Sequence, residues 1–259
     1  MHEDDQALRM LEYLCESQET RLDRLMEMVH DRDRLVVRTS STGTCGHDGP
    51  VTNVILPAKD TSRPRVVVMT HYDCWPGSYG YNDNGTGLVA ALLLQDRLPA
   101  HAEIVFTDNE EKGFRGADRY LDESPGEIAF GVNLDIVGVP DTVYFKTYGD
   151  MEITVPEGIK SRRLPSLVPN DCQAFAHRKI PAVIVMSGPT QDGPAEPMLR
   201  FLTDIWDYQH GGPLDRRDGA GLLSMAQVRR AADFAAAIVS ADGGRPRKRQ
   251  ELSHAIHAR

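Results

Sequence analysis

The 259-residue sequence has few cysteines and no long apolar run, and each shortage argues against a class of protein. Its four cysteines lie far apart and form no CxxC pair, which argues against a disulfide framework and against a cysteine-ligated zinc site. No segment approaches the roughly 18 apolar residues of a membrane span. We therefore expect reduced, mostly buried thiols and no membrane partner.

A basic surface and a secretory signal are also missing. The formal net charge is −9, whereas binding to phosphates needs a basic surface, so we expect no nucleic-acid partner. The first five residues are acidic, and a secretory signal needs a basic start followed by an apolar run. These features favour a cytoplasmic protein. No motif reports an interface, so the sequence leaves the oligomeric state open.

What is present is the composition of a globular protein, with 41% hydrophobic and 26% charged residues. Apolar residues recur at helical spacing in residues 1–30, and residues 17–20 either separate two helices or belong to a single one. Further along, β-prone runs alternate with helical ones: strands at 35–37, 51–56, 65–70, 102–107, 128–137, 142–148 and 182–186, and helices at 85–98, 112–121, 173–177 and 225–241.

This alternation predicts the fold class α/β: a single compact α/β/α sandwich with a mixed, mainly parallel central sheet and helices on both faces. The continuous β-branched run at 65–70 is typical of a strand buried on both faces. Residues 1–242 are expected to form one domain. Residues 243–259 begin with Gly-Gly and a basic cluster and lose apolar periodicity, so a flexible basic tail is expected there.

Two polar motifs flank the strand at 65–70 and the helix after it. His71 directly follows the strand, where ligands of α/β sheets bind, and Asp73 is placed to accept its second ring N–H. The segment Asn82-Asp83-Asn84-Gly85 reads most simply as a capped turn. Its alternative is a rigidly held carboxylate, Asp83, able to bridge two cations.

Three more candidates follow later in the sequence. Glu110 and Glu111 follow the strand at 102–107. They are either solvated residues at a helix start or a pair in which one binds metal and the other takes a proton from water. Asp135 lies in an apolar strand, where a carboxylate is costly unless paired or metal-bound. His210, alone, is an ordinary loop histidine.

Taken together, the order His-x-Asp, Asp-Asn-x-x-Gly, Glu-Glu-x-Gly, Asn-Leu-Asp-x-x-Gly and a late His resembles the di-zinc aminopeptidase family, which includes leucyl aminopeptidases, aminopeptidase Y and glutaminyl cyclases. The resemblance spans Val66 to His210 and the closing helix. It implies that residues 1–242 are a zinc peptidase domain. The gap from Asp135 to His210 leaves no room for an inserted lid domain beyond two strands and a helix.

The resemblance also implies a role for each residue. Asp83 would bridge two zinc ions, with His71 and Asp135 completing one site and Glu111 and His210 the other. Glu110 would be the general base and Asp73 the partner of His71, and the Asp83–Asn84 peptide bond would be cis. Two imidazoles and three carboxylates are also a chemically sensible zinc set, with cobalt or manganese as alternatives.

The sequence departs from the family pattern at two places. The family's Ser-Asp-His is Asn170-Asp171-Cys172 here, so Cys172 replaces a histidine, and His177 is expected to serve its helix instead of substituting for it. The motif after His210 is also altered. These changes indicate an unusual substrate. The aromatic residues between 72 and 81 either wall the cleft or pack on the sheet edge.

Three functions are therefore compared. The first is a zinc metallopeptidase that releases an N-terminal amino acid from a peptide or small amide substrate, with Glu110 as base. The second is a glutaminyl cyclase-like acyltransferase with one functional zinc. The third is a metal-free, non-catalytic binding protein, against which the intact ligand set argues.

Overall fold

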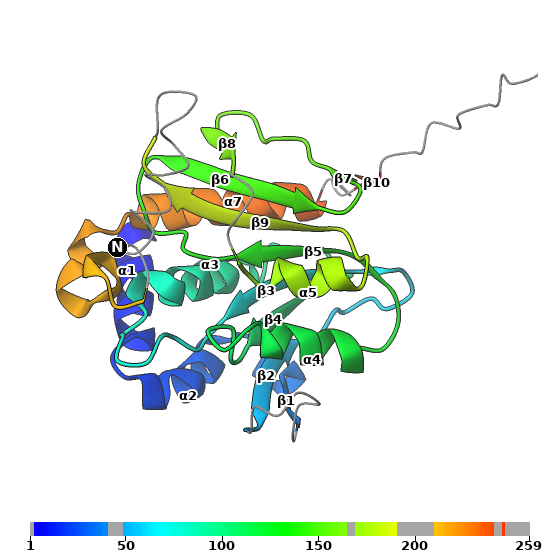
Figure 1. The fold of residues 1–259 in the computed structure, drawn as a ribbon, viewed down its shortest axis with the longest axis horizontal. Helices are drawn as coiled ribbons and strands as arrows, with labels where there is room; N and C mark the ends of the chain where they lie inside the picture. The colour runs from blue at the N-terminus through cyan, green and yellow to red at the C-terminus, as the bar shows by residue number, and fades with distance from the viewer. Residues whose placement is uncertain (1–2, 41–48, 165–168, 191–209, 241–244, 247–259) are drawn as a thin grey trace, which may run out of the picture.

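The computed structural model describes residues 3–40, 49–164, 169–190, 210–240 and 245–246. Its centre is an eight-stranded sheet in the order β1-β2-β4-β3-β5-β9-β6-β8 (Figure 1). The strands are β1 (Val36–Ser40), β2 (Val51–Leu56), β3 (Arg65–His71), β4 (Ala102–Thr107), β5 (Ile128–Leu134), β6 (Thr142–Tyr148), β8 (Ser161–Arg163) and β9 (Ala182–Gly188). The central strands β4, β3, β5 and β9 run parallel, and β1, β2 and β6 pair antiparallel beside them.

Helices cover both faces of this sheet (Figure 1). On one face lie α1 (Glu3–Leu14), α2 (Gln18–Met28), α3 (Gly87–Leu94) and α7 (Met225–Ser240); on the other lie α4 (Arg115–Glu123) and α5 (Cys172–His177). The predicted mixed α/β/α sandwich is confirmed. Among the described residues, no helix has the length and apolar character needed to cross a membrane.

Strand β3 shows why two helical layers form. Val66 and Val68 belong to the core under α3 and α7, whereas Val67 and Met69 belong to the core under α4 and α5. Successive side chains of a strand point to opposite faces, so a continuous apolar run must be covered on both.

Several boundaries differ from the predicted ones for local reasons. Ser17 caps α2 by accepting the N–H of Glu19 at 3.2 Å, so the first helical segment is two helices. The helix expected from Lys112 begins at Arg115, because Gly113 and Phe114 have positive φ values of 93° and 59°. Of the predicted tail, only β10 (Arg245–Pro246) is described; it pairs with β7 (Met151–Glu152), and the division into domain and tail stays a prediction.

Candidate metal centre

The carboxyl ends of three neighbouring parallel strands carry the polar motifs. His71 is the last residue of β3 and lies opposite Thr107, the last residue of β4. Glu110 and Glu111 follow β4, and Asp135 directly follows β5. Since β3 pairs with both β4 and β5, residues distant in sequence meet at one edge of the sheet.

A first cluster consists of His71, Asp83 and Asp135, whose potential ligand atoms all lie within 4.8 Å of one another. His71 Nε2 is 3.2 Å from Asp83 Oδ1 and 3.5 Å from Asp135 Oδ1. The three side chains are only 1%, 6% and 7% exposed. The cluster is therefore buried and could enclose one cation.

A second cluster consists of Asp83, Glu111 and His210, again within 4.8 Å. His210 Nε2 is 3.2 Å from Glu111 Oε2 and 3.9 Å from Asp83 Oδ2. Asp83 thus turns one carboxylate oxygen towards each cluster. The indole of Trp75 stacks on the His210 ring with a centroid separation of 4.4 Å, which orients the imidazole.

Asp83 reaches the strand ends on a tight turn whose Asp83–Asn84 peptide bond is cis. The Asn84 amide donates to the carbonyl of Leu134 at 2.9 Å, and its Oδ1 accepts the N–H of Ile136 at 3.2 Å. These two bonds lie on either side of Asp135. The turn therefore fixes Asp83 relative to Asp135.

Asp73 holds the two glutamates through their backbones. Its Oδ1 accepts the N–H of Glu110 at 3.0 Å and its Oδ2 accepts the N–H of Glu111 at 3.2 Å. His71 Nδ1 lies 3.1 Å from the backbone carbonyl oxygen of Asp73 and 3.4 Å from its carboxylate. The expected contact between Asp73 and His71 is thus present, but the carbonyl makes the shorter one.

The site concentrates negative charge in a poorly hydrated place. Burial raises the pKa of Asp83 to about 7, and burial also raises that of Glu110 well above its usual range, with Asp135 and Asp171 adding to the effect and His71 opposing it. Burial alone would lower the pKa of His71, but the surrounding carboxylates raise it well above its usual range. Cations bound here would relieve this repulsion.

The residues present fit divalent metal ions. His71 Nε2, Glu111 Oε1 and Asp135 Oδ1 are buried and have no hydrogen-bond partner within the described part of the chain. Such atoms are costly to bury unless something binds them. Imidazole nitrogens and carboxylate oxygens are common zinc ligands, so the donor set suits zinc.

A cavity of about 550 Å³ adjoins the second cluster. Tyr72, Trp75 and Lys112 line it beside Glu111 and Asp73. Its volume is in the range of small-molecule binding sites. Tyr72 and Trp75 therefore line the cleft, which is the first of the two alternatives given for the aromatic residues of this loop.

The other aromatic residues of this loop behave differently. Tyr81 is buried in the core under α1 and α3, and Tyr79, with 44% exposure, lies 6.5 Å from it between ring centroids. Neither of these two tyrosines lines the cavity, and only Tyr81 packs in the core.

Cys172 is the first residue of α5 and lies fully buried in the apolar core on that face of the sheet. Burial raises the pKa of its thiol well above the usual range, so it is a neutral core residue. His177, five residues on, is exposed at the end of α5. Next to Cys172, buried Asp171 accepts the Thr107 hydroxyl at 2.8 Å and lies close enough to raise the pKa of Glu110.

Two buried charged residues that shape the site were not among the predicted site residues. Arg21 of α2 is 1% exposed and donates to carbonyl groups of Leu14, Tyr72, Tyr79 and Gly80. Asp215, 0% exposed, accepts a hydrogen bond from the backbone N–H of Asp83, in the loop that also contains Tyr79 and Gly80. An arginine on an amphipathic helix and an aspartate in a polar loop are ordinary in sequence; only their burial distinguishes them.

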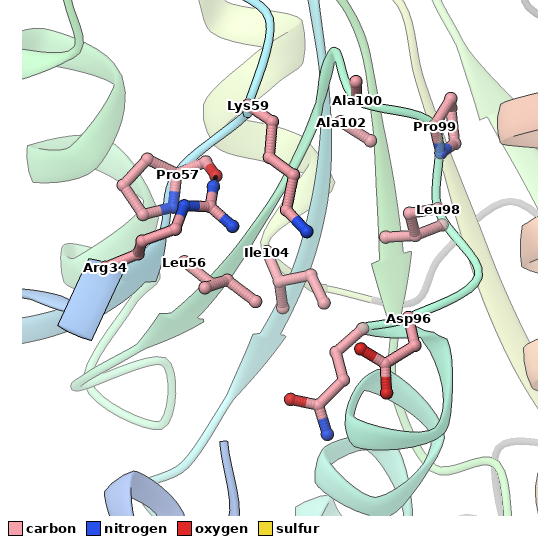
Figure 2. A pocket seen from close by; sticks show the side chains of 11 residues that line it. Arg34, Leu56, Pro57, Lys59, Asp96, Leu98, Pro99, Ala100, Ala102 and Ile104 are labelled. Atoms are coloured by element: carbon pink, nitrogen blue, oxygen red, sulfur yellow. Dashed lines mark hydrogen bonds between the residues drawn. The ribbon is translucent and has the colours of Figure 1, made fainter. Parts of the chain in front are cut away.

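A second cavity, of about 210 Å³, lies beside the start of β4 (Figure 2). The metal clusters lie at the other end of that strand. Its charged side chains already have partners. Arg34 bonds Asp31 at 2.7 Å, Lys59 Nζ is 3.4 Å from Asp31, and Asp96 lies 2.6 Å from His30. This cavity therefore offers little to a ligand.

Comparisons with known proteins point to one family. Residues 53–194 match the model of peptidase family M28. The probable lipoprotein aminopeptidase LpqL of Mycobacterium tuberculosis is 29% identical over 194 residues, covering 71% of this chain and 36% of that protein. The vacuolar membrane protease of Clavispora lusitaniae is 35% identical over 92 residues, covering 33% of this chain. The chain matches only 9% of that protease's length and about a third of LpqL's.

Solved structures agree with the fold. The LapA aminopeptidase of Legionella pneumophila superposes with a TM-score of 0.62 at 16% identity, over 93% of this chain and 71% of that one. Glutaminyl cyclase of Porphyromonas gingivalis gives 0.64 at 13% identity, over 92% of this chain and 98% of the other. The resemblance indicated by the sequence motifs is confirmed, and the chain belongs to peptidase family M28.

Proposed function

We propose that this peptidase uses two zinc ions to hydrolyse a peptide or small amide bond and release an N-terminal amino acid. The observation that carries the proposal is the pair of clusters that share Asp83, one oxygen of which faces each cluster. His71 and Asp135 would complete the first zinc site, and Glu111 and His210 the second. Similarity to proteins named as aminopeptidases supports cleavage at the N-terminus of the substrate.

When bound, two zinc ions would polarise the substrate carbonyl and lower the pKa of the attacking water. The remaining work falls to side chains of this protein. Glu110 takes the proton from that water and passes it to the leaving nitrogen. A carboxylate in a partly buried, anionic site binds a proton more readily than one in water, which suits this shuttle.

Asp73 fixes the orientations of Glu110 and Glu111. Because it accepts both backbone N–H groups, the two adjacent glutamates are held on one rigid turn. Glu111 faces His210 while Glu110 lies near His71 and Asp171. In this proposal Glu111 binds metal and Glu110 moves the proton. The cavity beside Glu111 would receive part of the substrate.

A glutaminyl cyclase-like acyltransferase is the second candidate, because the cyclase from Porphyromonas gingivalis superposes over 98% of its length. That reaction needs one functional zinc and a substrate with an N-terminal glutamine. Two complete clusters favour hydrolysis instead. Metal content and product identity separate the two activities.

The test replaces the proposed base with its isosteric amide. Glu110→Gln should retain two zinc ions per chain, measured by elemental analysis, while the rate of hydrolysis of aminoacyl anilides falls by roughly 10²–10⁴-fold. The substrate panel includes acylamino compounds and a peptide with N-terminal glutamine. Exposed Glu127→Gln is the matched control and should leave both readouts unchanged.

Full activity of Glu110→Gln would refute the role of the base. One tightly bound zinc together with cyclisation of the glutamine peptide would support the cyclase. A wild-type protein that binds no zinc and hydrolyses no member of the panel would support a non-catalytic binding protein.

A further inference from the structure

Asp215 is a fully buried carboxylate that lies outside both metal clusters. Its Oδ1 accepts the backbone N–H groups of Asn82 at 3.1 Å and Asp83 at 2.9 Å. Its Oδ2 accepts the N–H of Gly211 at 3.1 Å and the hydroxyl of Ser78. Four donors thus converge on one side chain.

These donors come from the two loops that carry candidate ligands. One donor is the backbone of Asp83 itself, and another is Gly211, which directly follows His210. Oδ1 holds the loop of Asp83, and Oδ2 holds both Ser78 of that loop and Gly211. Asp215 therefore links the position of Asp83 to that of His210. Both of these residues belong to the second cluster.

The first cluster has other supports. His71 ends a strand paired on both sides, and Asp135 follows β5 and is bracketed by the hydrogen bonds of Asn84. His210 instead lies in a loop with a positive φ of 53° and is 20% exposed. The second cluster therefore depends more on a cross-link between loops.

An amide could not replace this carboxylate. Three of the four partners are backbone N–H groups, which can only donate, whereas the side chain of asparagine presents one oxygen acceptor and one NH₂ donor. In an Asp215→Asn variant the NH₂ group would face N–H or O–H donors on one side. One loop would lose its anchor, although the volume of the side chain hardly changes.

We propose that Asp215 is a positioning residue that fixes the second metal site, formed by Asp83, Glu111 and His210, and has little influence on the first. The inference rests on the two-zinc function proposed above, and it adds a residue that contacts neither metal. Partners of metal ligands typically change metal affinity by 10–100-fold when they are mutated.

The experiment titrates metal-free protein with zinc against a chromophoric chelator, which resolves two stepwise dissociation constants without reference to catalysis. For Asp215→Asn we expect the second zinc site to lose affinity by roughly 10–100-fold, with the dissociation constant of the first site unchanged. Asp218→Asn, the same change at an exposed position three residues on, is the control and should behave as wild type.

Asp215→Glu keeps the charge but moves the carboxylate, so it should weaken the same site by a smaller factor; it also serves as the test if Asp215→Asn does not fold. Unchanged second-site affinity in the folded variants would overturn the inference. Equal losses at both sites would overturn it too, because they would indicate a general structural role. A wild-type protein that binds fewer than two zinc ions would instead refute the proposed function.

Discussion

Glu110 and Glu111 are neighbours in sequence but lie in different surroundings. Glu111 points one oxygen at His210, 3.2 Å away, and buries the other without a hydrogen-bond partner among the described residues. Glu110 lies among His71, Asp135 and Asp171, where burial raises its pKa. The shared anchor is Asp73, which accepts both backbone N–H groups.

Asp73 therefore provides a test at the scale of a single residue. In Asp73→Asn, one of the two N–H groups would face an NH₂ donor, so Glu110 and Glu111 would lose their fixed orientation. We expect kcat to fall by about 10–100-fold, while the Tm of the metal-loaded protein changes little.

The control for this variant is Asp150→Asn, the same change at an exposed position. Steady-state kinetics and a thermal melt on both variants check the expectation. A kcat equal to that of wild type in Asp73→Asn would show that the glutamates do not depend on this anchor.

The candidate ligands could be found from sequence because each one directly follows a strand or lies in a short motif. His71, Glu111 and Asp135 belong to that group. Asp215 stands in the altered motif after His210, but neither it nor Arg21 was predicted as a site residue, since their roles depend on burial against loops distant in sequence. Their chemistry exists only once the chain has folded.

Among the elements, long apolar runs were predicted best. Strands β2, β4 and β6 have the predicted bounds, because apolar, aromatic and β-branched residues make up most of each strand. The two- and three-residue strands β7 and β8 were missed, since so short a segment shows no periodicity. The helix predicted at 85–98 is shorter in the structure: α3 covers Gly87–Leu94 and follows the turn Tyr81–Thr86, in which Asp83 and Asn84 have non-helical dihedrals.

Helix α2 provides a second anchor for the loop that precedes Asp83, through the side chain of Arg21. Replacing that side chain is a test at the scale of an element. In Arg21→Met, buried carbonyl groups of Tyr72 and Gly80 would lose their donor. We expect the free energy of unfolding to fall by about 2–3 kcal/mol, measured by urea denaturation.

Arg24→Met is the matched control, one turn along the same helix. Arg24 contacts Glu16 and the Tyr13 carbonyl near the surface, and such contacts contribute up to about 1 kcal/mol. If the two variants were equally stable, the buried guanidinium would not support the loop.

In the whole molecule, the metal clusters depend on parts of the chain outside the family match at 53–194. Arg21 precedes that stretch, and His210 and Asp215 follow it. The sheet brings the strand ends together, and the N-terminal helices and the loop before α7 fix the turn that carries Asp83. We expect the complete chain, and not the matched stretch alone, to hold two metal ions.

The most direct test of this account is an anomalous difference map from crystals of the full chain grown with zinc. Two peaks are expected, one on each side of Asp83 and roughly 3.5–4 Å apart. The first should contact His71 and Asp135, and the second Glu111 and His210. A single peak, or peaks that avoid the Asp83 carboxylate, would contradict it.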